Sequence, residues 1–172
     1  MAYLIDTNIF IEAKNEYYAF DIAPSFWPAL LNAFQKGQAV TIDAVADEIQ
    51  AKEDNLAEWF AKNVKNSQPS SDKPFILSAK SDENVVSCYS TIASNVIQNS
   101  QYSEDNKRKF LDANKADPWI IAAARTWGYT LVTNEKLAGT GTKKVKIPNI
   151  CQQMNVTYTN LYAMMRDLHI QI

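Results

Sequence analysis

Tyr3-Leu4-Ile5-Asp6-Thr7-Asn8-Ile9-Phe10-Ile11 consists of two apolar runs separated by three polar residues. The first run, residues 3–5, is aromatic, aliphatic and β-branched, which favours a buried central strand. Residues 6–8 are of types that turn a chain and cap a helix, and residues 9–13 can form its first turns. A strand that leads directly into a helix brings Asp6 to the rim of a sheet, where open α/β folds place their sites. A simpler interpretation, in which Asp6 only caps the helix, fits this segment equally well.

The composition is that of an ordinary soluble protein, with 47% hydrophobic and 21% charged residues. We expect the 172 residues to form a single domain spanning 1–172. No apolar stretch approaches the roughly 20 residues of a membrane span, and no basic region precedes the first apolar run. We therefore expect a cytoplasmic protein that does not associate with membranes.

The scarcity of histidine and cysteine restricts the possible chemistry. His169 is the only histidine, and Cys88 and Cys151 are the only cysteines. These are too few for a disulfide framework or a zinc cluster, and no CxxC or HxxxH spacing is present. Any catalysis must then use carboxylates, lysines or hydroxyls. The net charge of −2 argues against a broad positive surface for duplex binding, so local basic patches matter more than the total.

A second strand and helix follow at residues 39–42 and 44–52, with Asp43 as the expected helix cap. Val45 and Ile49 lie four residues apart and form the core-facing stripe of that helix. Glu48 lies at the flank of this stripe, from which its carboxylate can reach toward Asp6. A solvent-exposed helix glutamate is the alternative interpretation.

A third stretch repeats the pattern of the first. Asp117 followed by Pro118 indicates a helix start, with aspartate as the cap and proline at the first helical position. The helix is expected to run to Gly128, and residues 129–133 form a buried strand that ends near Glu135. A helix and a strand joined by one glycine are typical of a βαβ connection, so we expect a parallel sheet.

The remaining chain is expected to be mainly helical, with a last strand near Val156. The predicted helices are 25–35, 56–64, 82–98, a short one from 147 and 160–169, with a surface loop at 66–74 and a further loop at 99–104.

Four carboxylates therefore occupy equivalent places at the rim of the predicted sheet. Asp6 and Glu135 follow strands, and Glu48 and Asp117 lie on neighbouring helices. Carboxylates at close range repel one another, so a divalent cation would neutralise them. Oxygen ligands alone favour Mg²⁺ or Mn²⁺ over zinc, and such a site can activate water for phosphodiester cleavage.

The order of these motifs resembles the PIN-domain nucleases. The matching motifs are LIDTN (4–8), DE (47–48), ADPWIIAAA (116–124) and LVTNE (131–135), and the resemblance extends from Met1 to about Met165. The chain is similar in particular to a small branch with a YYAFDIAPSFW segment, here Tyr17 to Trp27, and a KIPNIC segment, here Lys146 to Cys151.

This resemblance implies a three-layer α/β/α fold with a mostly parallel sheet and Mg²⁺- or Mn²⁺-dependent cleavage of single-stranded RNA. Asp6, Glu48 and Asp117 match the first three acidic positions of the family. Glu135 falls where many members have aspartate, so a longer side chain replaces the usual one. Asn8 and Thr133 match polar residues that orient the carboxylates or a metal-bound water.

The resemblance also implies partners. Many members are toxins of bacterial toxin–antitoxin pairs, held inactive by an antitoxin protein, and many dimerise. Basic residues flank the third and fourth acidic positions and are candidates for RNA phosphate contacts. They include Lys109, Lys115, Lys143, Lys144 and Lys146.

Two other function classes remain open at this point. One is a PIN-like module that binds RNA or a protein without cutting, although all four acids are retained. The other is a phosphatase in which a strand-end aspartate attacks phosphate, as in the haloacid-dehalogenase group. That group has Asp-x-Asp after the first strand, and Asn8 takes the second position here, which counts against it.

Overall fold

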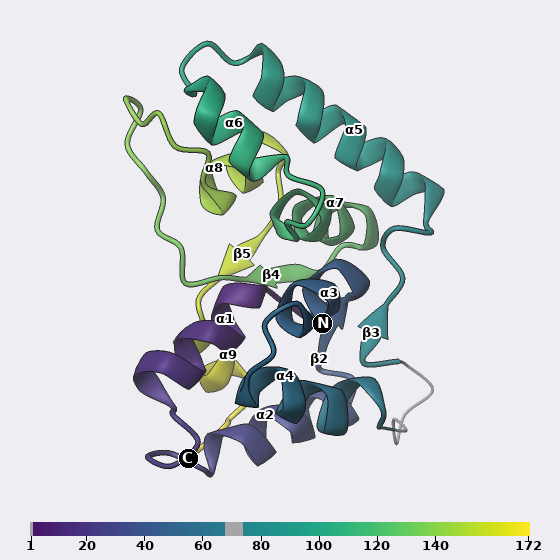
Figure 1. The fold of residues 1–172 in the computed structure, drawn as a ribbon, viewed down its shortest axis with the longest axis vertical. Coiled ribbons are helices and arrows are strands. Elements are labelled where there is room, and N and C mark those ends of the chain that lie inside the picture. Colours follow the sequence, from purple (N-terminus) through teal and green to yellow (C-terminus); the bar gives the residue numbers. More distant parts are fainter. Residues whose placement is uncertain (1, 68–73) are drawn as a thin grey trace.

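A computed structural model describes residues 2–67 and 74–172. Its centre is a sheet of five parallel strands in the order β3-β2-β1-β4-β5 (Figure 1). The strands are β1 (Tyr3–Ile5), β2 (Ala39–Ile42), β3 (Ile76–Leu77), β4 (Thr130–Val132) and β5 (Tyr158–Thr159). The α/β class and the parallel sheet predicted from the sequence are confirmed.

Helices cover both faces of this sheet, which gives the three-layer PIN-like architecture. The helices are α1 (Thr7–Glu12), α2 (Phe26–Gln35), α3 (Asp43–Gln50), α4 (Asn55–Phe60), α5 (Glu83–Gln98), α6 (Glu104–Phe110), α7 (Asp117–Trp127), α8 (Ile147–Gln153) and α9 (Leu161–Asp167), with π-helical turns η1 (Ala13–Tyr17) and η2 (Ala61–Lys65) continuing α1 and α4. In Figure 1, α5 to α8 lie above the sheet and α1, α2, α4 and α9 lie below it. No helix in the described ranges is both long and apolar enough to cross a membrane.

The strand order creates a crevice beside β1. The chain leaves β1 toward β2 on one side, whereas β4 pairs with β1 on the other side, with Ile5 opposite Val132. At such a change of direction the loops after neighbouring strands part, and open α/β sheets bind ligands there. The backbone N–H of Asp6 donates to the Val132 carbonyl at 3.2 Å, which joins the two strand ends.

The core explains why the short strands hold their positions. β1, β2 and β4 are buried along their whole length, and Leu4, Ile5 and Leu131 are fully buried. Below the sheet, the ring of Phe10 packs at 5.5 Å from Phe60 in an edge-to-face arrangement. Burying side chains of this size on both faces is the main favourable term in folding.

Several local expectations need correction. Residues 104–110 form α6, a helix that was not predicted from this polar sequence. The Ser103 hydroxyl caps the helix by accepting from the Asn106 N–H. Asp117 is the first residue of α7 and not its cap, which is Ala116. Likewise α3 begins at Asp43 and not at Ala44. Of the surface loop predicted at 66–74, residues 68–73 lie outside the described residues.

Candidate active site

Asp6 lies at the end of β1 and is fully buried. Its backbone carbonyl accepts from the Ile9 N–H at 3.2 Å, but its carboxylate caps no backbone group of α1. Oδ2 accepts a hydrogen bond from the Thr133 hydroxyl at 3.1 Å, and Oδ1 has no hydrogen-bond partner among the described residues. A buried, unpaired carboxylate oxygen is costly. Asp6 occupies the N-cap position of α1, but capping alone does not account for its carboxylate, which forms no side-chain cap bond.

The pKa of Asp6 also shows that its charged form is poorly compensated. Burial raises the pKa of Asp6 well above its ordinary value, and the charge of Asp117 raises it further. Smaller contributions come from Glu135 and Glu48, whereas the hydrogen bond from Thr133 lowers this pKa. All four predicted acids therefore lie close enough to interact through their charges.

Asp117 starts α7 on the side that faces this crevice. Its pKa is raised from 3.8 to about 7, first by burial and then by the charges of Glu135 and Glu48. Lys115 and Lys146 oppose this effect. The N-terminal end of a helix favours negative charge, but the neighbouring acids outweigh that preference.

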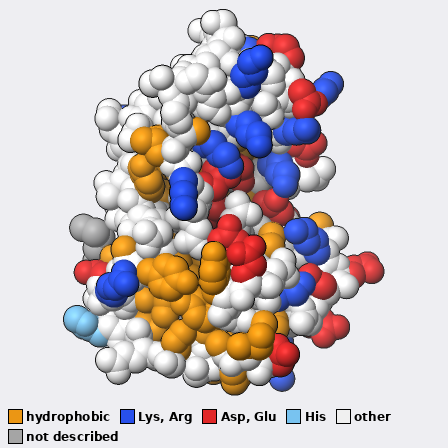
Figure 2. All heavy atoms as spheres, turned by 90° about the vertical axis from the view of Figure 1, so that its left-hand side faces the viewer, with side chains coloured by type: hydrophobic (Ala, Val, Ile, Leu, Met, Phe, Trp, Pro, Cys, Tyr) orange, Lys and Arg blue, Asp and Glu red, His pale blue; other side chains and the backbone are white. Residues whose placement is uncertain are grey.

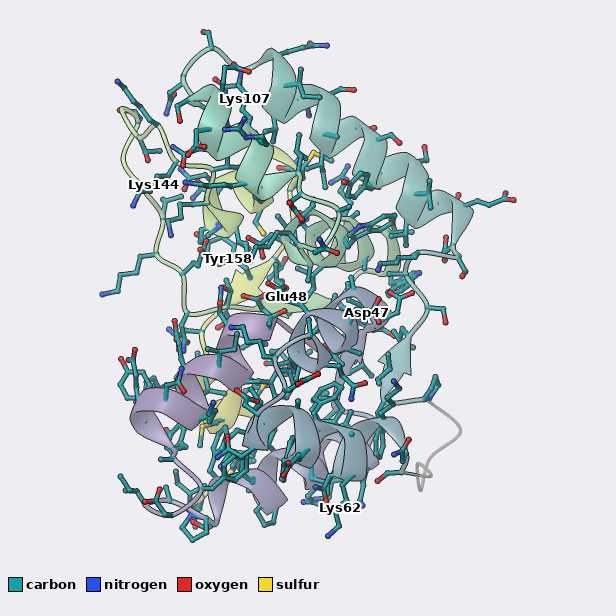
Figure 3. All side chains as sticks on the ribbon, in the orientation of Figure 1. Asp47, Glu48, Lys62, Lys107, Lys144 and Tyr158 are labelled. Carbon is teal, nitrogen blue, oxygen red and sulfur yellow. The ribbon has the colours of Figure 1, made fainter. Side chains whose placement is uncertain are left out.

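Glu48 reaches the site from α3, where its neighbour Asp47 points away and pairs with Lys80 (Figure 3). Oε1 of Glu48 accepts from Lys115 Nζ at 2.9 Å. Oε2 accepts from the Thr7 hydroxyl at 3.1 Å and from the Ala116 N–H at 3.2 Å. The carboxylate thus bridges the start of α1, next to Asp6, and the residue before α7.

Glu135 enters from the segment after β4. Oε1 accepts from Lys146 Nζ at 3.1 Å, and Oε2 accepts from the Ile147 N–H at 2.9 Å. The Glu135 N–H in turn donates to the Thr133 hydroxyl oxygen at 3.3 Å. Thr133 therefore links Asp6 to the backbone of Glu135, and α8 holds the far end of the glutamate.

The chemistry of these donors fits a divalent cation. When all four acids are ionised they carry four negative charges, and the two paired lysines return two positive charges, which leaves −2 at the site. One divalent cation balances that charge, and the unpaired Asp6 oxygen offers it a hard ligand. However, no three ligating side chains among the described residues converge as a ready-made metal cluster. Glu48 and Glu135 are instead paired with Lys115 and Lys146.

The sequence did not predict one supporting residue, and another that it did predict forms no side-chain hydrogen bond among the described residues. Thr7 is buried and orients Glu48, although it lies next to Asp6 in the same motif. Asn8 lies half-buried in the first turn of α1, and its side chain forms no hydrogen bond within the described ranges. Thr7 could have been predicted from its position just after the first strand, because residues that follow parallel strands lie at the rim of the sheet.

Four of the five predicted RNA-contacting lysines line one cavity of about 180 Å³ beside Asp117, the lysine cavity. They are Lys109, Lys115, Lys144 and Lys146. Lys143 does not line it, and the Lys143 carbonyl instead accepts from the Ser103 N–H. In Figure 2 basic side chains surround the acidic centre on its upper side.

Cys151 on α8 lies behind the acids but offers no nucleophile. Burial raises the pKa of its thiol to about 12, and the charges of Asp6 and Glu135 add to this effect. The thiol stays protonated at neutral pH, so thiolate chemistry is excluded. The candidate site is therefore one of carboxylates, lysines and threonines.

Comparison with known proteins supports the fold and defines the family. A chain of VapBC2 from Rickettsia felis, in a crystal structure with a DNA fragment from their promoter, superimposes with a TM-score of 0.55 at 17% identity. The match covers 93% of this chain and 98% of that chain. No curated protein matches the chain. The family model described as "Domain of unknown function (DUF4411)" matches residues 3–172, and the chain belongs to that family.

Proposed function

We propose that this protein is a divalent-metal-dependent endoribonuclease that cuts single-stranded RNA. The observation that carries the proposal is the unpaired, buried Oδ1 of Asp6, whose carboxylate lies close enough to Asp117 for the two charges to interact. A protein maintains such an uncompensated group where function needs it, and buried acids with raised pKa values mark functional sites. The choice of RNA cleavage as the reaction rests on the resemblance to PIN-domain nucleases.

Asp6, Asp117, Glu48 and Glu135 would hold the metal, Mg²⁺ or Mn²⁺. When bound, such a cation supplies a nucleophilic water at neutral pH and balances charge on the phosphodiester. Thr133 fixes one oxygen of Asp6, so the other oxygen keeps a constant direction. Lys115 and Lys146 lie between the glutamates and the lysine cavity, where they can contact RNA phosphates.

The similarity to a VapBC2 chain supports a role in a toxin–antitoxin pair. We propose that a small antitoxin protein holds this chain inactive in the cell. Expression of the protein alone should then slow bacterial growth, and the Asp6→Asn variant should not. A homodimer is the further assembly that the resemblance implies.

The decisive test is cleavage of a mixed pool of single-stranded RNA with Mn²⁺, with Mg²⁺ and with a chelator. We expect metal-dependent cutting that falls more than about 100-fold in Asp6→Asn and in Glu48→Gln. Asp47→Asn is the matched control, because Asp47 is the exposed neighbour of Glu48 on α3 and pairs with Lys80. Cutting that survives in chelator or in Asp6→Asn would contradict the proposal.

A second candidate is a PIN-like module that binds RNA or a protein without cutting. It is favoured by the two lysine–glutamate pairs, which occupy carboxylates that a metal would need. Calorimetric titration with Mn²⁺ separates the candidates. The nuclease must bind the cation and lose this binding in Asp6→Asn, whereas the binding module has no need of it.

A further inference from the structure

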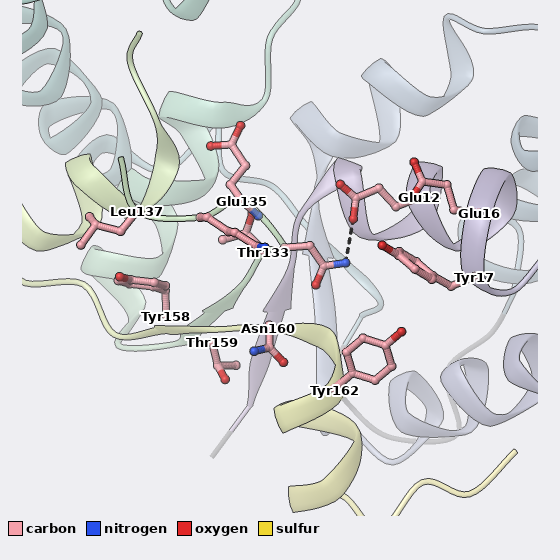
Figure 4. A pocket seen from close by; sticks show the side chains of 12 residues that line it. Glu12, Glu16, Tyr17, Thr133, Glu135, Leu137, Tyr158, Thr159, Asn160 and Tyr162 are labelled. Atoms are coloured by element: carbon pink, nitrogen blue, oxygen red, sulfur yellow. Dashed lines mark hydrogen bonds between the residues drawn. The ribbon is translucent and has the colours of Figure 1, made fainter. Parts of the chain in front are cut away.

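A second, larger cavity opens beside the acids, on the side opposite the lysine cavity. Its volume is about 690 Å³, which is the size of pockets that hold small ligands. Its lining comes from the end of α1 and η1, the segment after β4, β5 and the start of α9 (Figure 4). We call it the tyrosine cavity, because Tyr17, Tyr158 and Tyr162 line it.

These three rings form two facing walls. Figure 4 places Tyr158 on one side of the cavity and Tyr17 with Tyr162 on the other. The rings of Tyr17 and Tyr162 meet edge to face at 6.3 Å, and 51% and 43% of these residues remain exposed. Exposed aromatic walls around a cavity fit a flat, apolar ligand that stacks on them.

The tyrosine cavity begins at the acidic centre itself. Thr133 and Glu135 belong to its lining, and the Thr133 hydroxyl donates directly to Asp6. In Figure 2, acidic side chains lie between a basic region above and a hydrophobic region below. A strand of RNA crossing the acids would therefore meet lysines on one side and tyrosines on the other.

The charge of the tyrosine cavity selects which part of a nucleotide can enter. Glu12, Glu16 and Glu135 line it, against the single basic residue Lys136. Glu16 and Glu12 also raise the pKa of Tyr17, with Glu16 as the largest cause, so this wall lies in a negative potential. A phosphate is repelled there, whereas a neutral base with N–H donors is attracted.

We propose that the tyrosine cavity binds one unpaired base of the RNA substrate and prefers bases with an exocyclic amine over uracil. The inference rests on the proposed ribonuclease function and adds its base selectivity. Carboxylates only accept hydrogen bonds, and guanine, adenine and cytosine each present an amine that donates. Guanine presents two adjacent donors on its Watson–Crick edge, so it suits the carboxylate of Glu16 best.

The test measures RNA binding to Asp6→Asn, which carries the full chain but does not cut. Four labelled heptanucleotides, all uridine or with one central guanosine, adenosine or cytidine, are titrated by fluorescence anisotropy. We expect the guanosine oligonucleotide to bind at least about fivefold more tightly than the all-uridine one. Adding Tyr162→Ala should weaken binding of the guanosine oligonucleotide about tenfold, because a stacking surface is lost.

Matched variants assign the effects to the cavity. Glu16→Gln should remove most of the preference for guanosine, whereas Glu83→Gln, an exposed glutamate of α5, should leave it unchanged. Ile97→Ala, an exposed apolar residue of α5, is the control for Tyr162→Ala. Thermal melting of each variant checks that it is folded.

Two negative results have different meanings. Equal binding of all four oligonucleotides, unaffected by Tyr162→Ala, would overturn the base cavity and leave the nuclease standing. An arginine- or lysine-bearing protein segment would then be the occupant that the same acids and rings fit. Failure to bind any oligonucleotide, together with no cutting by the wild type, would overturn both proposals.

Discussion

The acids of the candidate site differ in how the protein compensates them. Glu48 and Glu135 each accept from a lysine and from a backbone N–H. Asp6 has one hydroxyl donor, and Asp117 faces the charges of the others. The two aspartates therefore carry the electrostatic cost of the site, and a proton or a cation can relieve it.

Asp117→Asn should make the metal-free protein more stable at high pH. The folded-state pKa of Asp117 is about 7 against an ordinary value of 3.8, so the folded protein holds a proton that the unfolded chain has lost. Stability then falls as pH rises from about 4 to about 7, by at most roughly 4 kcal/mol. The neutral asparagine removes this loss.

Urea unfolding in chelator between pH 4.5 and pH 8 measures the effect. The free energy of unfolding should decline less steeply with pH in Asp117→Asn than in the wild type. Asp21→Asn, at an exposed position, is the control and should follow the wild type. Identical slopes for wild type and Asp117→Asn would show that Asp117 does not retain its proton on folding.

At the scale of elements, the junction between α7 and β4 sets the geometry of the site. α7 runs from Asp117 to Trp127 with Gly128 as its C-cap, and β4 starts two residues after Gly128. Gly128 adopts φ 71°, a left-handed conformation that ends the helix and lets the Tyr129 N–H reach the Ala124 carbonyl. This tight reversal places Thr133 next to Asp6 at the far end of β4.

Gly128→Ala should destabilise the protein by about 1 kcal/mol. A Cβ at this position meets no atom within 4 Å, so the cost comes from the left-handed backbone alone. Gly139→Ala is the matched control, because a Cβ there is equally free and the backbone needs no positive φ. Urea midpoints compare the two, and equal stability of both variants would contradict the argument.

At the scale of the whole molecule, the sheet order brings distant segments together. β1 lies between β2 and β4, so residues near positions 6, 48, 117 and 135 reach one crevice. A cation bound there would link α1, α3, α7 and the segment before α8. Ligands that bind only the folded state stabilise it by an amount that grows with the logarithm of their concentration relative to Kd.

Mn²⁺ should therefore raise the melting temperature of the wild type. At 100 times Kd the gain is about 2.7 kcal/mol, which corresponds to roughly 5–10 °C for a chain of this size. Asp6→Asn should show little of this rise, whereas Asp47→Asn should show all of it. Thermal scanning with and without chelator measures the shift, and an equal rise in Asp6→Asn would place the cation elsewhere.

The sequence by itself determined the α/β class, the parallel sheet and the identity of the candidate acids. Strands of three or four buried residues and helix boundaries such as Gly128 are encoded locally, by apolar runs and by residues with special backbone preferences. The hydroxyl and carboxylates at strand ends could be found for the same reason, because a parallel sheet gathers its strand ends at one edge.

Only the tertiary structure decided which groups compensate those acids and which cavities flank them. The pairing of Glu48 with Lys115 and of Glu135 with Lys146 depends on side-chain directions across separate elements. The unpaired oxygen of Asp6 and the contact between the rings of Tyr17 and Tyr162 likewise depend on segments far apart in the sequence. Local sequence patterns set the element that a residue joins, whereas packing between elements sets the neighbours it meets.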